Sequence, residues 1–291
     1  MTARGRRLLA RFVTMLVAGL AGILNVGALP AAADTVGVGQ YVALGDSYAA
    51  GQGAPPYLND DDCLQSLNGY PYRLDAENKI HLRANAACTG AKTSDVSDVQ
   101  LSALKQSTRL VTLTVGAADL GLSQVLAACT AGSPTQCQAA IGMANLLLPA
   151  ECGDESELGR RLTELYAEVA AAAPNALIVA TGYPLLFELV QGDPDLILKA
   201  QINDATTRLN CAIESAVDNA QDADINIVYV DVTEAFAGHG IGSEEPFINP
   251  PPPLGTATEA FHPTAAGYVA YAETISAVLP SSWGANQKQV A

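Results

Sequence analysis

Aromatic and basic side chains are scarce in this sequence. Its 291 residues include 5% aromatic residues, and 15 Lys and Arg stand against 30 Asp and Glu, for a formal net charge of −15. A surface of this charge repels nucleic acid and anionic lipid headgroups, so neither is expected as a partner. The core has to be built mainly from Ala, Val, Leu and Ile. The 49% hydrophobic content is enough for one large core, and nothing demands two domains.

Several sequence signals are also absent. No Cys-x-x-Cys pair or His-rich cluster occurs, so no metal site is expected, and no cofactor motif stands out. No G-x-S-x-G elbow is present, which argues against an ordinary α/β-hydrolase. Only three histidines occur, His81, His239 and His262, so the choice of a catalytic base is narrow.

The longest apolar run lies at the N-terminus. A basic stretch ending at Arg11 precedes apolar residues over 12–29, and a run of alanines ends at Ala33. This pattern predicts a secretory signal peptide over residues 1–33, rather than a retained membrane anchor, and a mature domain over residues 34–291. The segment holds four arginines and no acid, so its removal lowers the net charge from −15 to −19. We therefore expect a secreted protein, extracellular or in the cell envelope, with no stable membrane span after cleavage.

All six cysteines follow this segment: Cys63, Cys88, Cys129, Cys137, Cys152 and Cys211. An even number of cysteines in an exported chain predicts three disulfides, for which fifteen connectivities are possible.

Strand patterns alternate with helical patterns along the rest of the chain. Strands are expected over 41–44, 80–87, 109–115, 176–180 and 225–230. Helices are expected over 70–78, 93–106, 157–172, 195–220 and 263–279, with two more between 120 and 148. Right-handed crossovers then give an α/β fold, a three-layer α/β/α sandwich with a five-stranded parallel sheet.

The stretch from Tyr41 to Gly51 joins the first strand to a tight turn. The strand stops at Gly45, which lets the backbone turn without a Cβ clash, and Asp46 and Ser47 follow. The Ser47 hydroxyl is therefore expected at the carboxyl end of a parallel strand, where open α/β sheets bind ligands. Taken alone, this tripeptide is more simply a turn whose serine caps a helix.

A second polar group lies far along the chain. His262 is in a loop just before the last helix, and Glu259 lies three residues ahead of it. A serine needs a base to become nucleophilic, and the base needs an acceptor to orient it; this one loop can supply both. His81 is expected on the surface, and His239, between two glycines, is the one rival base.

Four blocks of sequence resemble the SGNH (GDSL-type) hydrolases, in particular their secreted actinobacterial esterase and lipase branch. The blocks are Gly45-Asp46-Ser47-Tyr48, Ala87-Cys88-Thr89-Gly90-Ala91, Val115-Gly116-Ala117-Ala118-Asp119 and Glu259-Ala260-Phe261-His262-Pro263. The third block departs from the family's Gly-x-Asn-Asp, and the fourth departs from Asp-x-x-His-Pro. The resemblance runs over nearly the whole mature chain and implies a flavodoxin-like sandwich.

The resemblance also implies roles for individual residues. Ser47 would form an acyl-enzyme with His262 as the general base. Glu259 occupies the position of the orienting aspartate, and its extra methylene leaves a backbone carbonyl as an alternative partner for His262. The oxyanion hole maps to the backbone N–H groups of Ser47 and Gly90, with Ala118 at the usual Asn position. The implied disulfides are Cys63–Cys88 and Cys129–Cys137, which leaves Cys152–Cys211.

Together these features predict a metal-independent serine ester hydrolase of lipase or esterase type. We expect a monomer that acts on a small-molecule or lipid ester without a cofactor. One alternative is an acyltransferase or polysaccharide deacetylase on the same fold. The other is a catalytically weakened envelope protein that binds a lipid or a glycan; Ala118 favours it, whereas Ser47 and His262 argue against it.

Overall fold

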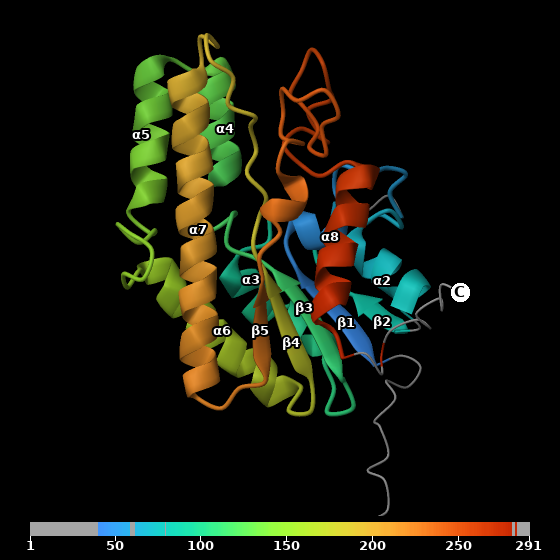
Figure 1. The fold of residues 1–291 in the computed structure, drawn as a ribbon. Helices are drawn as coiled ribbons and strands as arrows, with labels where there is room; N and C mark the ends of the chain where they lie inside the picture. Colours follow the sequence, from blue (N-terminus) through green and yellow to red (C-terminus); the bar gives the residue numbers. More distant parts are fainter. Residues whose placement is uncertain (1–39, 59–61, 79, 281–282, 284–291) are drawn as a thin grey trace, which may run out of the picture. The chain divides into compact units, whose positions relative to one another are not determined.

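The structure is a computed structural model that describes residues 40–58, 62–78, 80–280 and 283 (Figure 1). The signal peptide expected over residues 1–33 lies outside the described residues. Within the described part of the chain, no helix is both long enough and apolar enough to cross a membrane.

Five parallel strands form the central sheet: β1 (Tyr41–Gly45), β2 (Leu82–Asn85), β3 (Leu110–Thr114), β4 (Leu177–Thr181) and β5 (Ile227–Val230). Their order is β2-β1-β3-β4-β5, and every neighbouring pair is parallel. All residues of β1 and β3 are buried, as expected for apolar strands covered on both faces. The predicted five-stranded parallel sheet is confirmed, and its order is that of flavodoxin-like folds, which bind ligands between β1 and β3.

Helices cover both faces of this sheet. Among the described residues they are α1 (Ser47–Ala50), α2 (Tyr70–Asn78), α3 (Thr93–Asp98), α4 (Leu122–Ala131), α5 (Pro134–Asn145), α6 (Glu157–Ala172), α7 (Leu196–Asp222) and α8 (Ala265–Val278), with 3₁₀ turns η1 (Gln100–Ala103) and η2 (Glu234–Phe236). Helices α2 and α8 pack together on one face, whereas α3, α6 and α7 pack in succession on the other (Figure 1). The predicted three-layer α/β/α sandwich is confirmed.

The helices follow from local sequence signals. In α6, Ser156 caps the first turn by accepting the Gly159 N–H at 3.0 Å. Its buried side chains recur every three or four residues and so face the sheet side: Leu158, Leu162, Leu165, Tyr166 and Val169. In α5, Pro134 stands in the first turn behind a capping box of Ser133 and Gln136.

Most strand and helix limits lie within two residues of the expected ones. The segment over 93–106 is the main exception, because it breaks into α3 and η1 instead of continuing as one helix. At this break the buried Gln100 side chain turns toward Gly45 and forms hydrogen bonds with both the N–H and the carbonyl of its backbone.

The disulfides are Cys63–Cys88 and Cys129–Cys137, the two pairs implied by the family resemblance, and Cys152–Cys211, the pair that these two leave. The first ties the loop after α1 to the block that holds Gly90. The second joins α4 to α5 as a helical hairpin, and the third joins the segment after α5 to α7. Each cross-link restricts the unfolded chain and thereby stabilises the fold.

Candidate active site

A cleft of about 340 Å³ opens at the carboxyl ends of β1 and β3, where flavodoxin-like sheets bind ligands. One part of its lining is polar and holds Asp46, Ser47, Gln52, Thr89 and His262. The larger apolar side chains come from α4 and from the loop over residues 249–263, which we call the histidine loop: Leu122, Leu126, Pro251, Pro252 and Phe261. The cleft therefore combines a polar end with an apolar wall.

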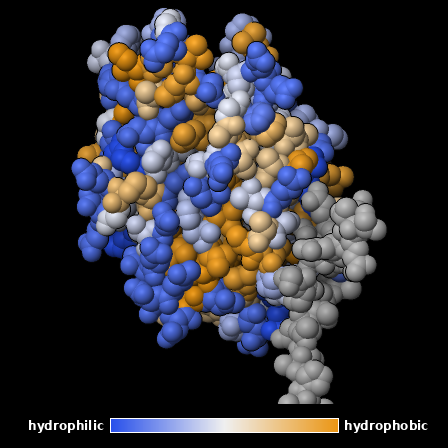
Figure 2. Space-filling model, in the orientation of Figure 1, coloured by the Kyte–Doolittle hydropathy of each residue, from blue (hydrophilic) through white to orange (hydrophobic). Residues whose placement is uncertain are grey.

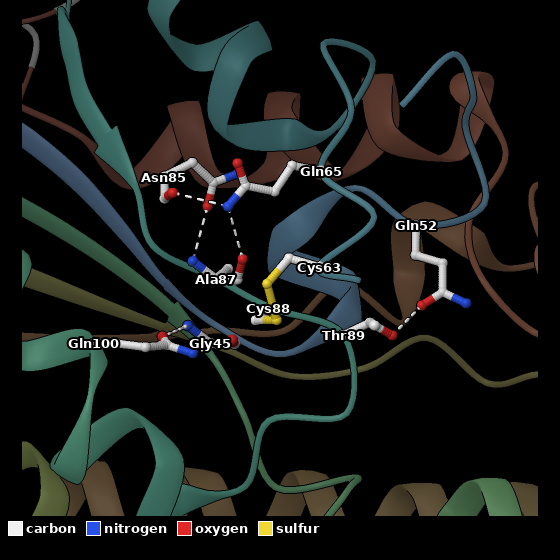
Figure 3. Close-up of a disulfide and its surroundings, with 9 residues drawn as sticks. All are labelled: Gly45, Gln52, Cys63, Gln65, Asn85, Ala87, Cys88, Thr89 and Gln100. Carbon is white, nitrogen blue, oxygen red and sulfur yellow. Dashed lines mark hydrogen bonds between the residues drawn. A yellow bond between two sulfur atoms is a disulfide. The ribbon is translucent and has the colours of Figure 1, made fainter. Parts of the chain in front are cut away.

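Gly45 and Asp46 build the turn that carries Ser47, which we call the serine turn (residues 45–51). Gly45 has φ +128°, and a Cβ there would lie 2.0 Å from a backbone carbonyl oxygen of β3, so only glycine fits. The Gln100 side chain accepts the Gly45 N–H at 2.7 Å and donates to its carbonyl at 2.9 Å (Figure 3). The Asp46 carboxylate accepts the Tyr48 N–H at 2.9 Å and caps α1. Ser47 thus begins α1 at the rim of the sheet.

The structure brings Ser47 and His262 together from opposite ends of the chain. The Ser47 Oγ lies 2.9 Å from Nε2 of His262. On the other side of the ring, Nδ1 lies 2.8 Å from the carbonyl oxygen of Ala260. Because a nitrogen that faces a carbonyl carries the ring proton, Nε2 is left to accept the Ser47 O–H. The three groups have the geometry of a nucleophile, its base and an orienting acceptor.

The Glu259 side chain does not contact the imidazole. Its carboxylate accepts a hydrogen bond from the Thr256 hydroxyl, which in turn accepts the Glu259 N–H at 3.1 Å. Only the Glu259 backbone reaches the histidine, since its carbonyl accepts the His262 N–H at 3.1 Å. The sequence left two possible partners for the imidazole, the Glu259 carboxylate and a backbone carbonyl. In the structure the ring nitrogen faces a backbone carbonyl, that of Ala260.

Partly buried hydrogen bonds hold the histidine loop against the serine turn and Gly53 behind it. The Tyr48 hydroxyl donates to the Phe261 carbonyl at 2.7 Å. The Asn249 amide donates to the carbonyls of Gly53 and His262, both at 2.9 Å. Phe261 has φ +65°, an uncommon conformation for a residue with a side chain, directly before the histidine. These contacts fix the imidazole relative to the serine hydroxyl.

Burial shifts the pKa values of His262 and Asp46, two titratable groups beside the serine, in opposite directions. It lowers the pKa of His262 to about 4, because the imidazolium is poorly solvated there, and hydrogen bonds to two backbone carbonyls offset only part of this effect. It raises the pKa of Asp46 to about 7, against the hydrogen bond that the Tyr183 hydroxyl donates at 2.5 Å. At neutral pH the imidazole is therefore neutral and able to accept a proton.

The backbone N–H groups of Ser47 and Gly90, two residues of the cleft lining, have no acceptor within the described part of the chain. Gly90 has φ +75°, and the space beside its Cα is open. Ala118 also lines the cleft and brings only a methyl group to the position where the family resemblance places an Asn. Two backbone donors are thus available for an oxyanion, without a side-chain donor from residue 118.

Gln52 links the three parts of the site, a role that the sequence did not indicate. Its side-chain amide donates to the Thr258 carbonyl in the histidine loop at 2.5 Å. Its side-chain oxygen accepts the Thr89 hydroxyl, next to Gly90 (Figure 3). Gln52 lies between two glycines and is 7% exposed. The glycines indicate a turn, but they say nothing of where the side chain between them points.

We expect Gln52→Ala to lower both stability and turnover. Loss of the amide removes two partly buried hydrogen bonds, one to the Thr258 carbonyl and one from the Thr89 hydroxyl, and each is worth about 0.5–1.5 kcal/mol in the free energy of unfolding. The loosened contact between the glycine block and the histidine loop lowers kcat by up to about 10²-fold. Denaturant titration and ester hydrolysis measure the two effects. Thr89→Val removes one contact only and is the matched control; unchanged kcat in Gln52→Ala would contradict the assignment.

The other two histidines lie outside the cleft lining. His239 stacks on the Phe247 ring with centroids 3.8 Å apart, and its Nδ1 lies 2.7 Å from the Glu245 carbonyl oxygen. His81 is on the surface, 3.8 Å from the Asp75 carboxylate. Among the residues that the structure describes, no three His, Cys, Asp or Glu side chains are grouped so that they could hold a metal ion.

Comparison with known proteins gives consistent matches over most of the chain. The profile of the GDSL-like Lipase/Acylhydrolase family matches residues 43–270. Lipase 1 of Streptomyces coelicolor is 31% identical over 264 residues, which are 89% of this chain and 93% of that protein. A lipase of Streptomyces rimosus is 33% identical over 233 residues, which are 78% of this chain and 81% of that protein.

Solved structures give the same result. Phospholipase A1 from Streptomyces albidoflavus NA297 has a TM-score of 0.73 and 34% identity, over 83% of this chain and 99% of that chain. An extracellular lipase from Streptomyces rimosus has a TM-score of 0.71 and 29% identity, over 82% and 99%. The family match begins within β1 and ends within α8, so it includes both the serine turn and the histidine loop. The chain therefore belongs to the GDSL-like lipase/acylhydrolase family and is a carboxylic ester hydrolase of the SGNH type.

Proposed function

We propose that this protein hydrolyses esters through an acyl-enzyme on Ser47, with His262 as general base and then general acid. The observation that carries the proposal is the alignment of two contacts, Ser47 Oγ to Nε2 at 2.9 Å and Nδ1 to the Ala260 carbonyl at 2.8 Å. A serine hydroxyl becomes nucleophilic when a neutral base in hydrogen-bond contact takes its proton, and this ring is neutral at pH 7.

The reaction runs in two halves. Ser47 Oγ attacks the ester carbonyl carbon while its proton passes to His262; the tetrahedral intermediate then expels the alkoxide, which takes that proton and leaves as the alcohol. Water next gives a proton to His262 and attacks the acyl carbon, and the Ser47 oxygen leaves and recovers the proton. The N–H groups of Ser47 and Gly90 bind the oxyanion, and the Ala260 carbonyl stabilises the imidazolium.

The cleft lining supports a lipid ester as the substrate. Leu122 and Leu126 of α4 and Pro251 and Pro252 of the histidine loop provide an apolar surface for an acyl chain. The polar end beside Ser47 accommodates the ester group. The similar proteins are lipases and a phospholipase A1 by name, which agrees with this class of substrate.

Partition of the acyl group tests the intermediate. The purified protein hydrolyses butyrate esters of two different alcohols while a third alcohol is added as a competing acceptor. We expect the same ratio of butyric acid to new ester from both substrates, because both pass through one acyl-enzyme. A ratio that depends on the leaving alcohol would contradict the proposal. A product mixture dominated by new ester at low alcohol concentration would instead favour an acyltransferase.

The pH profile should have an unusually low acid limb. Protonated His262 cannot accept the serine proton, and its pKa is about 4, so kcat/KM should stay level above about pH 5 and fall tenfold per unit below about pH 4. A pH-stat assay on a soluble ester measures this. The pKa of Asp46 is about 7, so Asp46→Asn is the control: an acid limb that is unchanged in this variant belongs to His262 and not to Asp46. A midpoint near 6.5 in both proteins would contradict the burial argument.

Ala118→Asn is expected to raise turnover. The new amide would stand in the cleft lining beside Ser47 and Gly90 and provide a third oxyanion donor, which is worth up to about 10²–10³ in kcat. The gain should be in kcat rather than KM, since the oxyanion develops during the reaction and is absent from the bound ester. Ala118→Asp is the matched control, because a carboxylate of the same size cannot donate. No gain in Ala118→Asn would mean that another donor already completes the hole.

We also propose that the protein is exported. The terminal sequence pattern, three disulfides and the similarity to a lipase that is named extracellular support export. Protein recovered from the culture medium should begin at Asp34; a start at Met1 would contradict cleavage.

A further inference from the structure

Four large apolar side chains are exposed at the end of the domain where the cleft opens. They are Leu189 (45% exposed), Val190 (50%), Ile197 (77%) and Leu254 (85%), and we call them the apolar rim. The first two lie between β4 and α7, the third in the first turn of α7, and the fourth in the histidine loop. The start of α7 and the histidine loop project from the same end of the domain, beyond the carboxyl ends of the strands, and apolar surface lies on both projections (Figures 1 and 2).

The rim is continuous with the cleft. The ring of Phe187, two residues before Leu189, packs edge-on against Phe261 with centroids 6.3 Å apart, and Phe261 lines the cleft. In the histidine loop, Leu254 follows a proline run whose Pro251 and Pro252 form part of the cleft lining. An apolar ligand that contacts the rim therefore lies beside the entrance to the site.

Charge around the rim restricts what can dock there. The segment over 184–200 holds one basic residue, Lys199, and this ammonium is paired with Asp193 at 2.5 Å. The segment over 241–263 holds no Lys or Arg. The two segments contribute six acids: Glu188, Asp193, Asp195, Glu244, Glu245 and Glu259. Such a rim repels an anionic surface and offers no free cation to hold it, so the surface that fits is apolar and electrically neutral.

We propose that the apolar rim docks this enzyme on the surface of an electrically neutral lipid aggregate. Large apolar patches on a soluble protein mark interaction surfaces, and these exposed side chains lie at the end of the domain where a cleft with an apolar wall opens. Each Leu or Ile side chain removed from water favours the docked state by about tenfold or more. The benefit for catalysis rests on the proposed function, since an ester lipid would pass from the aggregate straight into the cleft. Docking itself requires only the rim.

Binding is tested first, in the Ser47→Ala background so that no lipid is consumed. We expect this protein to cosediment with phosphatidylcholine vesicles and more weakly with phosphatidylglycerol vesicles. Ile197→Ser with Leu254→Ser should lower the partition coefficient by at least about tenfold. The matched control is Val99→Ser with Met143→Ser, two side chains that are 65% and 68% exposed, at the end of α3 and in α5. Equal loss in the control pair, no binding to phosphatidylcholine, or stronger binding to phosphatidylglycerol would overturn the proposal.

Activity then separates docking from catalysis. With Ser47 present, the rim variant should hydrolyse a monomeric short-chain ester within about twofold of wild type and should lose rate on ester lipid in vesicles in proportion to its lost binding. Equal losses on both substrates would place these residues in the cleft and overturn the proposal. Vesicle binding by a protein that hydrolyses neither ester would retain the docking surface and refute the proposed function instead. If the wild type is a dimer that the rim substitutions separate, the rim is a self-association surface and lipid docking is refuted.

Discussion

Ser47→Ala is expected to abolish ester hydrolysis, with kcat lower by about 10⁶-fold. The hydroxyl that lies 2.9 Å from Nε2 of His262 is the atom that would carry the acyl group, and a methyl group cannot replace it. The rate that remains comes from the oxyanion donors and substrate binding alone. Release of p-nitrophenol from p-nitrophenyl butyrate by equal amounts of both proteins measures the effect, after near-UV spectra and thiol titration show both to be folded and disulfide-bonded.

Ser123 offers a matched control for this variant, since it also lines the cleft, from α4. Ser123→Ala should keep turnover within about tenfold of wild type. Loss of a catalytic proton transfer would lower turnover by more than that, about 10²–10⁴-fold. If Ser47→Ala retained a tenth of the activity, another group would be the nucleophile.

His262→Ala is the second large loss that we expect, about 10⁴–10⁶-fold in kcat. Without the imidazole, no other group in the described part of the chain is hydrogen-bonded to the Ser47 hydroxyl to accept its proton as attack begins. Burial keeps this ring neutral at pH 7, so its removal costs a base that is fully available in wild type. The same p-nitrophenyl ester assay measures the loss.

Substitutions at two other residues, His239 and Glu259, serve as controls. His239→Ala should be nearly as active as wild type, because its ring stacks on Phe247 outside the cleft lining. Glu259→Gln should change kcat by less than about tenfold, since its carboxylate bonds the Thr256 hydroxyl; an orienting carboxylate would be worth about 10⁴. A deep loss in either control, beside a mild one in His262→Ala, would refute the assignment of the base.

The parts of the fold that depend on local pattern could be predicted from the sequence. Short stretches of sequence are enough to predict these parts, as in the apolar run of β1, the break at Gly45 and the periodic apolar face of α6. The break of 93–106 could not be read in this way. It depends on where the Gln100 side chain turns, toward a backbone that is 55 residues away in sequence.

The candidate site divides along the same line. Ser47 and His262 have reactive side chains and lie in short sequence motifs, so both could be predicted from the sequence. In the structure the two side chains are in contact. The Ala260 carbonyl cannot be named in advance, because every residue has one and only the loop conformation selects it. The amides of Gln52 and Asn249 were missed because loop amides are common and their partners are distant backbone groups.

Covalent trapping tests the central claim most directly. An alkyl p-nitrophenyl phosphonate ester presents a phosphorus atom where the ester carbonyl would lie. Attack forms a bond from Ser47 Oγ to phosphorus and breaks the bond from phosphorus to the p-nitrophenyl oxygen, so p-nitrophenolate leaves while His262 takes the serine proton. We predict one adduct per wild-type molecule by intact mass, located on Ser47 by peptide mapping, with loss of activity in step with labelling. Ser47→Ala should gain no adduct. Labelling of another residue in step with inactivation, or full activity in a protein labelled at Ser47, would contradict the account.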